Sequence, residues 1–317
     1  AVNSGTSALH IACLAIGLQK NDYLWTSAVS FVSSANCGLF CGAKIELIDI
    51  EKGSANIDLD LLEQKLIEAK KNKKLPKVII PVHMSGQSVN MIRLKKLSIK
   101  YKFKIIEDAS HALGSTYKNK PVGCGKYSDI CVFSFHPVKS ITTGEGGVAL
   151  TNQKEIFKKL RSFRTHGIIS NIELSKNGRK VLPWYYEQVD LGYNYRMSDI
   201  SAALGISQLK RVDEFIKKRK LIAEKYFIAL NGLPLKMTSL EQIACSSNHL
   251  YVIRIDKTMT KKNNLDLYNF FLKHQIKLNL HYIPIYRHPY YKQMKFKMKN
   301  FPNSEKYYKR AITLPMF

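Results

Sequence analysis

Residues 129–151 have the sequence DICVFSFHPVKSITTGEGGVALT, and this stretch decides the fold class. Its two ends, Asp129–Ser134 and Gly146–Thr151, are apolar and are predicted to form strands. The connection between them is too short for a helical crossover, so the two strands are expected to be antiparallel. Lys139 lies in this connection, among small and hydroxyl-bearing residues.

Upstream of this pair, apolar strands alternate with helices. The predicted strands are Tyr23–Thr26, Lys44–Asp49, Val78–His83 and Phe103–Asp108. The predicted helices are Thr6–Leu18, Phe31–Cys41, Asp58–Lys71 and Met91–Tyr101. Such alternation is typical of a largely parallel sheet that is covered on both faces. The sequence therefore predicts an α/β fold with a mixed, mostly parallel sheet.

The rest of the chain predicts a second, smaller unit. A polar loop over residues 167–193 precedes a long helix at Ser198–Leu230. Beyond the helix we expect a strand at Leu250–Ile255, a helix at Asn264–His274 and a strand at Lys277–Tyr282. A chain of 317 residues is long enough for two domains. We expect a large domain over residues 1–205 and a smaller α+β domain over residues 206–317.

Composition excludes several classes of protein. No run of 18 apolar residues occurs, so no membrane helix is expected. The start, Ala1–Gly5, does not resemble a signal peptide, and a cytoplasmic location is expected. The six cysteines are scattered without a C-x-x-C pair, so we expect free thiols and neither disulfides nor a metal site.

The net charge of +26 raises the question of nucleic acid binding. The excess comes from lysines dispersed along the chain, and no DNA- or RNA-binding pattern accompanies them. We interpret the excess as a general lysine bias on solvated faces and expect no nucleic acid partner. A positive field would still help to attract an anionic substrate.

Lys139 and Asp108 are the candidate reactive pair. A lysine that forms a Schiff base needs desolvation to depress its pKa, and a carboxylate beside a pyridine nitrogen keeps that nitrogen protonated. Asp108 ends an apolar strand, and His111 follows in position to orient this carboxylate or to cover the ring. The pair fits pyridoxal 5'-phosphate. The alternatives are a lysine exposed in a hairpin loop and an aspartate that caps a turn.

The start of the first helix is a candidate phosphate site. Gly5, Thr6 and Ser7 lie there, and a helix N-terminus offers free N–H groups and a favourable dipole to an anion. The hydroxyl of Ser134 would add a hydrogen bond. Phe31 follows the second strand and would stack on a cofactor ring, although a core aromatic is the alternative.

Five motifs in order along the chain carry a family resemblance. They are Asn3–Leu9 (NSGTSAL), Glu107–Gly114 (EDASHALG), Ser134–Lys139 (SFHPVK), Thr143–Gly147 (TGEGG) and Gly192–Asp199 (GYNYRMSD). With them the chain resembles the nucleotide-sugar aminotransferases of the DegT/DnrJ/EryC1/StrS family. The resemblance implies a fold-type I pyridoxal-phosphate-dependent transferase. Family members carry a further N-terminal segment and a short C-terminal tail, so substrate residues from that segment are not expected in this chain.

The resemblance also implies roles for individual residues. Lys139 would be the catalytic residue that forms the Schiff base and moves a proton, with Asp108 on the pyridine nitrogen. Asn194 would reach the phosphate bound by a neighbouring subunit, so a homodimer is implied. The other residues of the implied cofactor site are Gly5, Thr6, Ser7, Phe31, His111 and Ser134. The segment of Asn279, Leu280, His281 and Tyr282 would border the sugar nucleotide.

Two segments, Pro183–Gln188 and His281–Tyr286, are most similar to the C4 aminotransferases of pseudaminic acid biosynthesis. That similarity implies transfer of an amino group from glutamate, which becomes 2-oxoglutarate, to C4 of a UDP-linked 4-keto-6-deoxy-N-acetylhexosamine. Arg287 is a candidate for the diphosphate, with a solvated surface arginine as the alternative. Other expectations stay open: C3 amination, another epimer as in the legionaminic acid or bacillosamine pathways, or a non-catalytic homologue that binds the cofactor.

Overall fold

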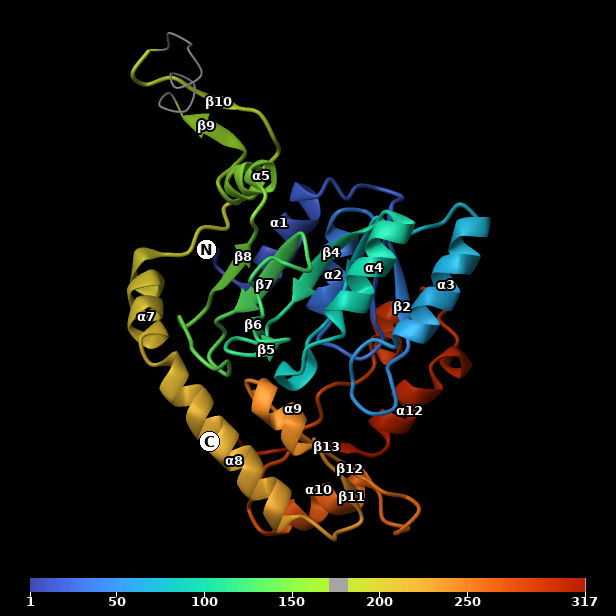
Figure 1. Ribbon diagram of the computed structural model, residues 1–317. Coiled ribbons are helices and arrows are strands. Elements are labelled where there is room, and N and C mark those ends of the chain that lie inside the picture. The colour runs from blue at the N-terminus through green and yellow to red at the C-terminus, as the bar shows by residue number, and fades with distance from the viewer. Residues whose placement is uncertain (171–181, 317) are drawn as a thin grey trace.

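The computed structural model describes residues 1–170 and 182–316, and over these residues the chain is an α/β protein with a mixed, mostly parallel sheet (Figure 1). The sheet has the strand order β2-β1-β3-β4-β7-β8. Its strands are β1 Tyr23–Ser27, β2 Lys44–Ile48, β3 Val78–Ile80, β4 Lys104–Asp108, β7 Ile130–Ser134 and β8 Gly147–Leu150. Neighbouring strands from β2 to β7 are parallel, and β8 is antiparallel to β7, as residues 129–151 predicted.

Helices cover both faces of this sheet and bury a separate core on each. The helices are α1 Gly5–Ala15, α2 Ser33–Phe40, α3 Leu59–Lys71, α4 Met91–Tyr101 and α5 Lys154–Arg164. Alternate strand residues point to opposite faces. In β1, Leu24 packs with α1 and α2, whereas Trp25 packs with α3 and α4. Because the strands from β2 to β7 are parallel, their carboxyl ends lie at one edge of the sheet, where α/β proteins build their sites.

The segment predicted as a polar loop over residues 167–193 contains a hairpin. Strands β9 Ile168–Ser170 and β10 Tyr186–Gln188 pair antiparallel and project away from the body (Figure 1). Residues 171–181 of the predicted loop lie outside the described residues. A second small hairpin, β5 Thr116–Tyr117 and β6 Lys120–Pro121, lies between β4 and β7 in the sequence.

The single long helix predicted at Ser198–Leu230 is wrong. The chain forms α7 Asp199–Leu209 and α8 Val212–Ala229, and Arg211 between them leaves helical geometry (φ −108°, ψ 3°). Neither Gly nor Pro marks this break. The two helices differ in their packing, because α8 buries Ala223 in the core of the small sheet while α7 buries no residue.

The smaller sheet is antiparallel, with the order β11-β12-β13. It consists of β11 Leu235–Lys236, β12 Tyr251–Ile255 and β13 Ala311–Leu314, and it is accompanied by α9 Leu240–Cys245 and α10 Asn264–Lys273. The strand predicted at Lys277–Tyr282 is wrong, since this segment makes only a single bridge, from Asn279 to Thr313. β13 occupies the place beside β12 instead.

The last part of the chain returns to the large sheet. It forms η2 Ile285–Arg287, α11 Pro289–Lys292, η3 Met298–Asn300 and α12 Pro302–Tyr308. Ile285, Tyr286, Tyr291 and Phe301 lie in the same core as α1 and α2. The division at residue 205 therefore stays a prediction. Among the described helices, none is both long and apolar enough to span a membrane.

Candidate active site

Lys139 lies between β7 and β8, half-buried rather than exposed in a hairpin loop. Burial lowers the pKa of Lys139 to about 8, against the opposing effect of the Asp108 carboxylate. A solvated lysine has a pKa near 10.4. Lys139 is therefore far closer to its neutral, nucleophilic form at neutral pH than a surface lysine would be.

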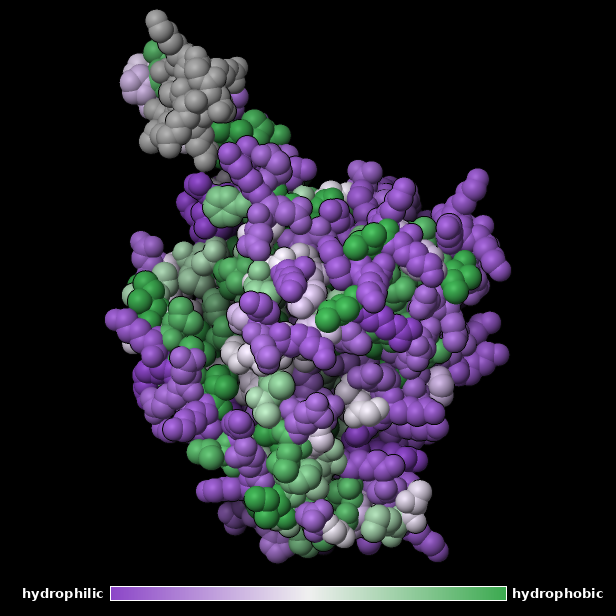
Figure 2. All heavy atoms as spheres, in the orientation of Figure 1, coloured by the Kyte–Doolittle hydropathy of each residue, from purple (hydrophilic) through white to green (hydrophobic). Residues whose placement is uncertain are grey.

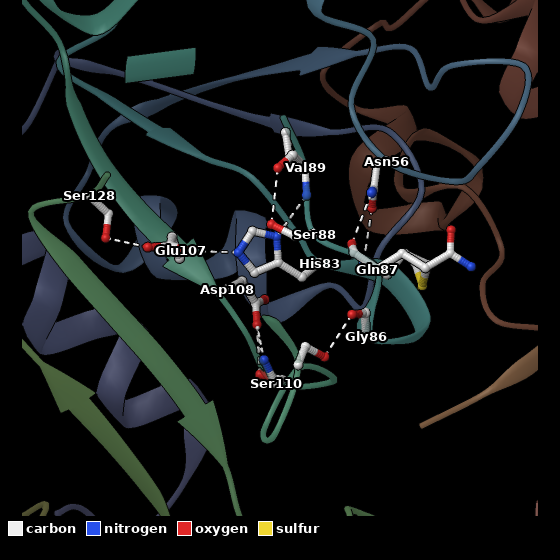
Figure 3. Close-up of polar contacts among 12 residues, drawn as sticks. Asn56, His83, Gly86, Gln87, Ser88, Val89, Glu107, Asp108, Ser110 and Ser128 are labelled. Carbon is white, nitrogen blue, oxygen red and sulfur yellow. Dashed lines mark hydrogen bonds and ion pairs between the residues drawn. The ribbon is translucent and has the colours of Figure 1, made fainter. Parts of the chain in front are cut away.

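Asp108 ends β4 and is only 4% exposed. Its Oδ1 accepts hydrogen bonds from the backbone N–H of Ser110 at 3.2 Å and from the Ser110 hydroxyl at 2.6 Å (Figure 3). Its Oδ2 accepts a hydrogen bond from the Ser34 hydroxyl at 2.6 Å. Asp108 thus caps the following turn and also presents a buried carboxylate. Sequence reasoning missed Ser34, because only the fold brings α2 to β4.

A buried chain of hydrogen bonds connects His83, Glu107 and Ser128, and Glu107 directly precedes Asp108 in the sequence. His83 Nδ1 accepts a hydrogen bond from the N–H of Val89 at 3.2 Å, so a neutral ring carries its proton on Nε2 (Figure 3). Nε2 donates this proton to Glu107 at 2.7 Å, and the Ser128 hydroxyl donates to the other Glu107 oxygen. These hydrogen bonds give both oxygens of the buried Glu107 carboxylate a donor, and they hold the end of β4, where Asp108 follows, in place.

The N-terminus of α1 forms a cradle against the end of β7. A Cβ built on Gly5 would lie 2.9 Å from Ser134 Cβ, and one on Gly147 would lie 2.6 Å from the Ser4 carbonyl carbon. Only glycines allow this approach. Ser4 caps the helix by accepting the N–H of Ser7 at 3.0 Å. Within the described residues the N–H groups of Gly5 and Thr6 have no acceptor, so they are available to an anion.

Three histidines surround Lys139. Burial lowers the pKa of His111 and of His249 well below the usual value and that of His281 to about 4, and the charge on Lys139 lowers all three further. All three rings are therefore neutral near pH 7. Sequence reasoning missed His249, whose ring centroid lies 4.6 Å from that of His111 and whose Nδ1 has no partner among the described residues. No motif marked this residue.

His111 does not orient Asp108. Its Nδ1 accepts the N–H of Ser85 at 3.4 Å, and its Nε2 lies 3.0 Å from the Tyr282 hydroxyl, whose ring is stacked on the His111 ring. Phe31 is 56% exposed, with its ring centroid 6.0 Å from that of Tyr282. Phe31 is thus no core aromatic. The two aromatic rings and His111 form a wall beside Lys139 and Asp108.

The other predicted residues lie in different surroundings. His281 neighbours Lys139 and Tyr282, and its Nδ1 lies 2.9 Å from the Thr313 hydroxyl. Asn279 and Leu280 line a separate hollow beside α10. Asn194 is exposed and makes a bridge with Thr165.

Arg287 is neither a solvated surface arginine nor free for a diphosphate. Its guanidinium forms a two-point ion pair with Glu305, in which Nε donates at 2.9 Å. It also lies over the ring of Tyr308, 4.7 Å from the centroid. The candidate role for Arg287 is therefore unsupported, because its charge is already neutralised.

These residues fit pyridoxal phosphate. The cradle of Gly5, Thr6 and Ser134 supplies N–H groups and a hydroxyl to a phosphate, and Asp108 offers a buried carboxylate to a pyridine nitrogen. Lys139 supplies an amine with a depressed pKa. Phe31 offers an exposed ring for stacking.

Comparisons with known proteins agree with this chemistry. The sequence matches the DegT/DnrJ/EryC1/StrS aminotransferase family over residues 1–317. A UDP-4-amino-4,6-dideoxy-N-acetyl-beta-L-altrosamine transaminase of Campylobacter jejuni subsp. jejuni is 38% identical over 315 residues, covering 99% of this chain and 79% of that protein.

Two solved structures share the fold. Helicobacter pylori PseC, an aminotransferase involved in the biosynthesis of pseudoaminic acid, has a TM-score of 0.85 at 32% identity, covering 99% of this chain and 80% of that one. The PLP form of the putative sugar aminotransferase Spr1654 from Streptococcus pneumoniae has a TM-score of 0.84 at 29% identity, covering 99% and 81%. The chain therefore belongs to the DegT/DnrJ/EryC1/StrS aminotransferase family and is a pyridoxal-phosphate-dependent aminotransferase.

Proposed function

We propose that this enzyme transfers an amino group from glutamate to C4 of a UDP-linked 4-keto-6-deoxy-N-acetylhexosamine, in a pathway of the pseudaminic acid type. The observation that carries the amination chemistry is the placement of the half-buried Lys139 beside the buried Asp108 carboxylate. The substrate class rests on similarity to the Campylobacter transaminase and to the Helicobacter enzyme.

In this proposal each residue has a defined task. Bound pyridoxal phosphate supplies an electron sink for charge that develops at the reacting carbon. As a carboxylate, Asp108 would accept a hydrogen bond from the protonated pyridine nitrogen and so keep the proton on the ring. The neutral Nζ of Lys139 would take the proton from the amino donor's α-carbon, and in the second half-reaction the protonated Nζ would deliver a proton to C4 of the sugar. His111 and Tyr282, joined by a hydrogen bond, exclude water on one side of the lysine.

A matched pair of assays tests the proposal. The holoenzyme is given glutamate and the UDP-4-keto sugar, and the product is identified by NMR. An amino group at C4 supports the proposal, whereas amination at C3 or of another epimer replaces it. Lys139→Ala should lose at least about 10²–10⁴-fold in turnover, the usual contribution of a positioned acid–base group. Absence of turnover by the wild-type protein, with cofactor bound, would indicate a non-catalytic homologue.

We also propose that two copies form a homodimer in which Asn194 approaches the partner's site. Helix α7 buries no residue, and Ile200 is 86% exposed and Ile206 64% exposed. Figure 2 shows apolar side chains gathered over the region of α7. Such a patch is typical of an interface. Ile200→Asp should convert a dimer to monomers in light scattering, while Ile99→Asp, at a residue of α4 that is 69% exposed, should not. If light scattering gave the same particle mass for Ile200→Asp and Ile99→Asp, this interface would be wrong.

A further inference from the structure

A cationic cleft lies where the large sheet, the small sheet and α12 meet. Its volume is about 280 Å³, which is room for roughly nine water molecules at liquid density. The cleft is lined by the loop after β2, by strands β11 and β12 and by α12 (Figure 1). Hydrogen bonds hold these elements together: the N–H of Asn303 donates to the Asp49 carboxylate, and the N–H of Ile255 donates to the carbonyl of Arg310. The walls of the cleft are therefore fixed by the fold.

Five basic side chains line this cleft: Lys52, Lys236, Arg254, Lys306 and Arg310. Only one lining residue is acidic, Glu51, and it bonds the Ser54 hydroxyl. Lys236 lies 3.6 Å from Asp256. Within the described residues, the other four cations have no carboxylate partner closer than 4.0 Å.

Arg254 is the fixed cation of this group. Its guanidinium donates to the carbonyl oxygens of Lys52 and Gly53, at 2.5 and 2.8 Å, which anchors it to the loop after β2. It is half-buried on β12, and burial lowers its pKa. A half-buried guanidinium that no carboxylate compensates favours an anion beside it.

The general lysine bias of the chain does not account for this cleft. Basic residues are 50 of 317 in the chain but 5 of the 11 that line the cleft. In the large hollow beside β2, four lysines are offset by Glu46, Asp49 and Glu68. In the cationic cleft, five basic side chains are offset only by Glu51, which lines it, and by Asp256 beside Lys236. Mutual repulsion among its cations is relieved only by a bound anion or by counterions.

We propose that this cleft binds a phosphate-bearing anion at a site distinct from the cradle of Gly5 and Ser134. Two or more negative charges match four uncompensated cations, and Arg254 offers the planar donor geometry that suits phosphate oxygens. Tyr307 lines the cleft and donates its hydroxyl to the carbonyl of His281, so the site adjoins the active-site wall. The anion is either the diphosphate of a nucleotide substrate or a separate phosphate compound.

Calorimetric titration of the holoenzyme with inorganic pyrophosphate tests this site. The cofactor fills the cradle, so the cradle does not compete, and ionic strength is held constant with KCl. The wild type should bind pyrophosphate saturably. The double variant Lys306→Glu/Arg310→Glu should bind at least about tenfold more weakly, because each reversal replaces an attraction by a repulsion. Should that variant fail to fold, Lys306→Gln/Arg310→Gln should show a smaller loss in the same direction.

The control is Lys96→Glu/Lys217→Glu, which removes the same charge from two exposed helical positions. Equal weakening in both double variants, or no saturable binding by the wild type, would overturn the proposal in favour of a general positive field. KM then identifies the source of the anion. If the KM for the sugar nucleotide rises only in the cleft variant, the cleft binds the diphosphate of the substrate. If the cleft variant loses pyrophosphate binding but keeps its KM, the cleft binds a separate phosphate compound.

Discussion

Asp108→Asn is the substitution that separates the chemistry of the site from its architecture. The amide has nearly the same shape as the carboxylate, and one oxygen remains to accept a hydrogen bond from Ser34 or Ser110. What is lost is a negative charge at a side chain that is 4% exposed. The expected result is a folded enzyme that binds its cofactor poorly and turns over slowly.

The magnitude follows from burial and from the two serines. Removing one partner of a buried, hydrogen-bonded charge pair costs about 2–5 kcal/mol. With about 1.4 kcal/mol per decade, the expected loss in kcat/KM is roughly 30- to 4,000-fold. The free energy of unfolding should fall by only about 1–3 kcal/mol, the cost of one mismatched buried hydrogen bond. The pKa of Lys139 should also fall, because the Asp108 carboxylate raises it.

Asp129→Asn is the matched control. Asp129 is 6% exposed and accepts hydrogen bonds from Lys104, Gln153 and the N–H of Ile105, but it lies at the opposite end of the strands. Its amide variant should lose stability and keep kcat/KM. The assays are absorbance titration with the cofactor, half-reaction kinetics with glutamate, and thermal melting. If Asp108→Asn kept kcat/KM within a few-fold with cofactor bound, the assigned role would be wrong.

Two further predictions concern the lysine and the cradle. With a pKa of about 8, the neutral fraction of Lys139 rises from roughly one-tenth at pH 7 to roughly nine-tenths at pH 9. The rate at which the apoenzyme captures the cofactor, measured by stopped-flow absorbance, should therefore increase with pH and level off above pH 9. A rate that does not change with pH would contradict this. Gly5→Ala places a methyl group 2.9 Å from Ser134 Cβ and should weaken cofactor binding about tenfold or more. In the control Gly53→Ala the methyl group meets open space, and the dissociation constant of the cofactor should not change. Equal dissociation constants for the two variants would show that the cradle is not needed.

Much of the large sheet and of the helices that cover it was predictable because their signals are local. The period-2 and period-3.6 patterns mark which faces are buried, and the short connection around Lys139 determined that β7 and β8 are antiparallel. Helix α4 has the bounds that its periodicity predicted. The part of the chain that forms the small sheet was harder to predict. The segment Lys277–Tyr282 has the apolar character of a strand, yet it pairs with β13 at a single bridge, between Asn279 and Thr313, and does not extend into a strand.

The sequence by itself determined the α/β class, the position of Lys139 in a loop of small residues and the place of Asp108 at a strand end, because each depends on the order of neighbours along the chain. Only the tertiary structure decided which distant groups meet them. Ser34 reaches Asp108 across 74 residues of sequence, and the ring of His249 lies 4.6 Å from that of His111 although no motif marks it. Such contacts depend on how helices and sheets pack, and packing joins residues whose separation in the sequence carries no local pattern.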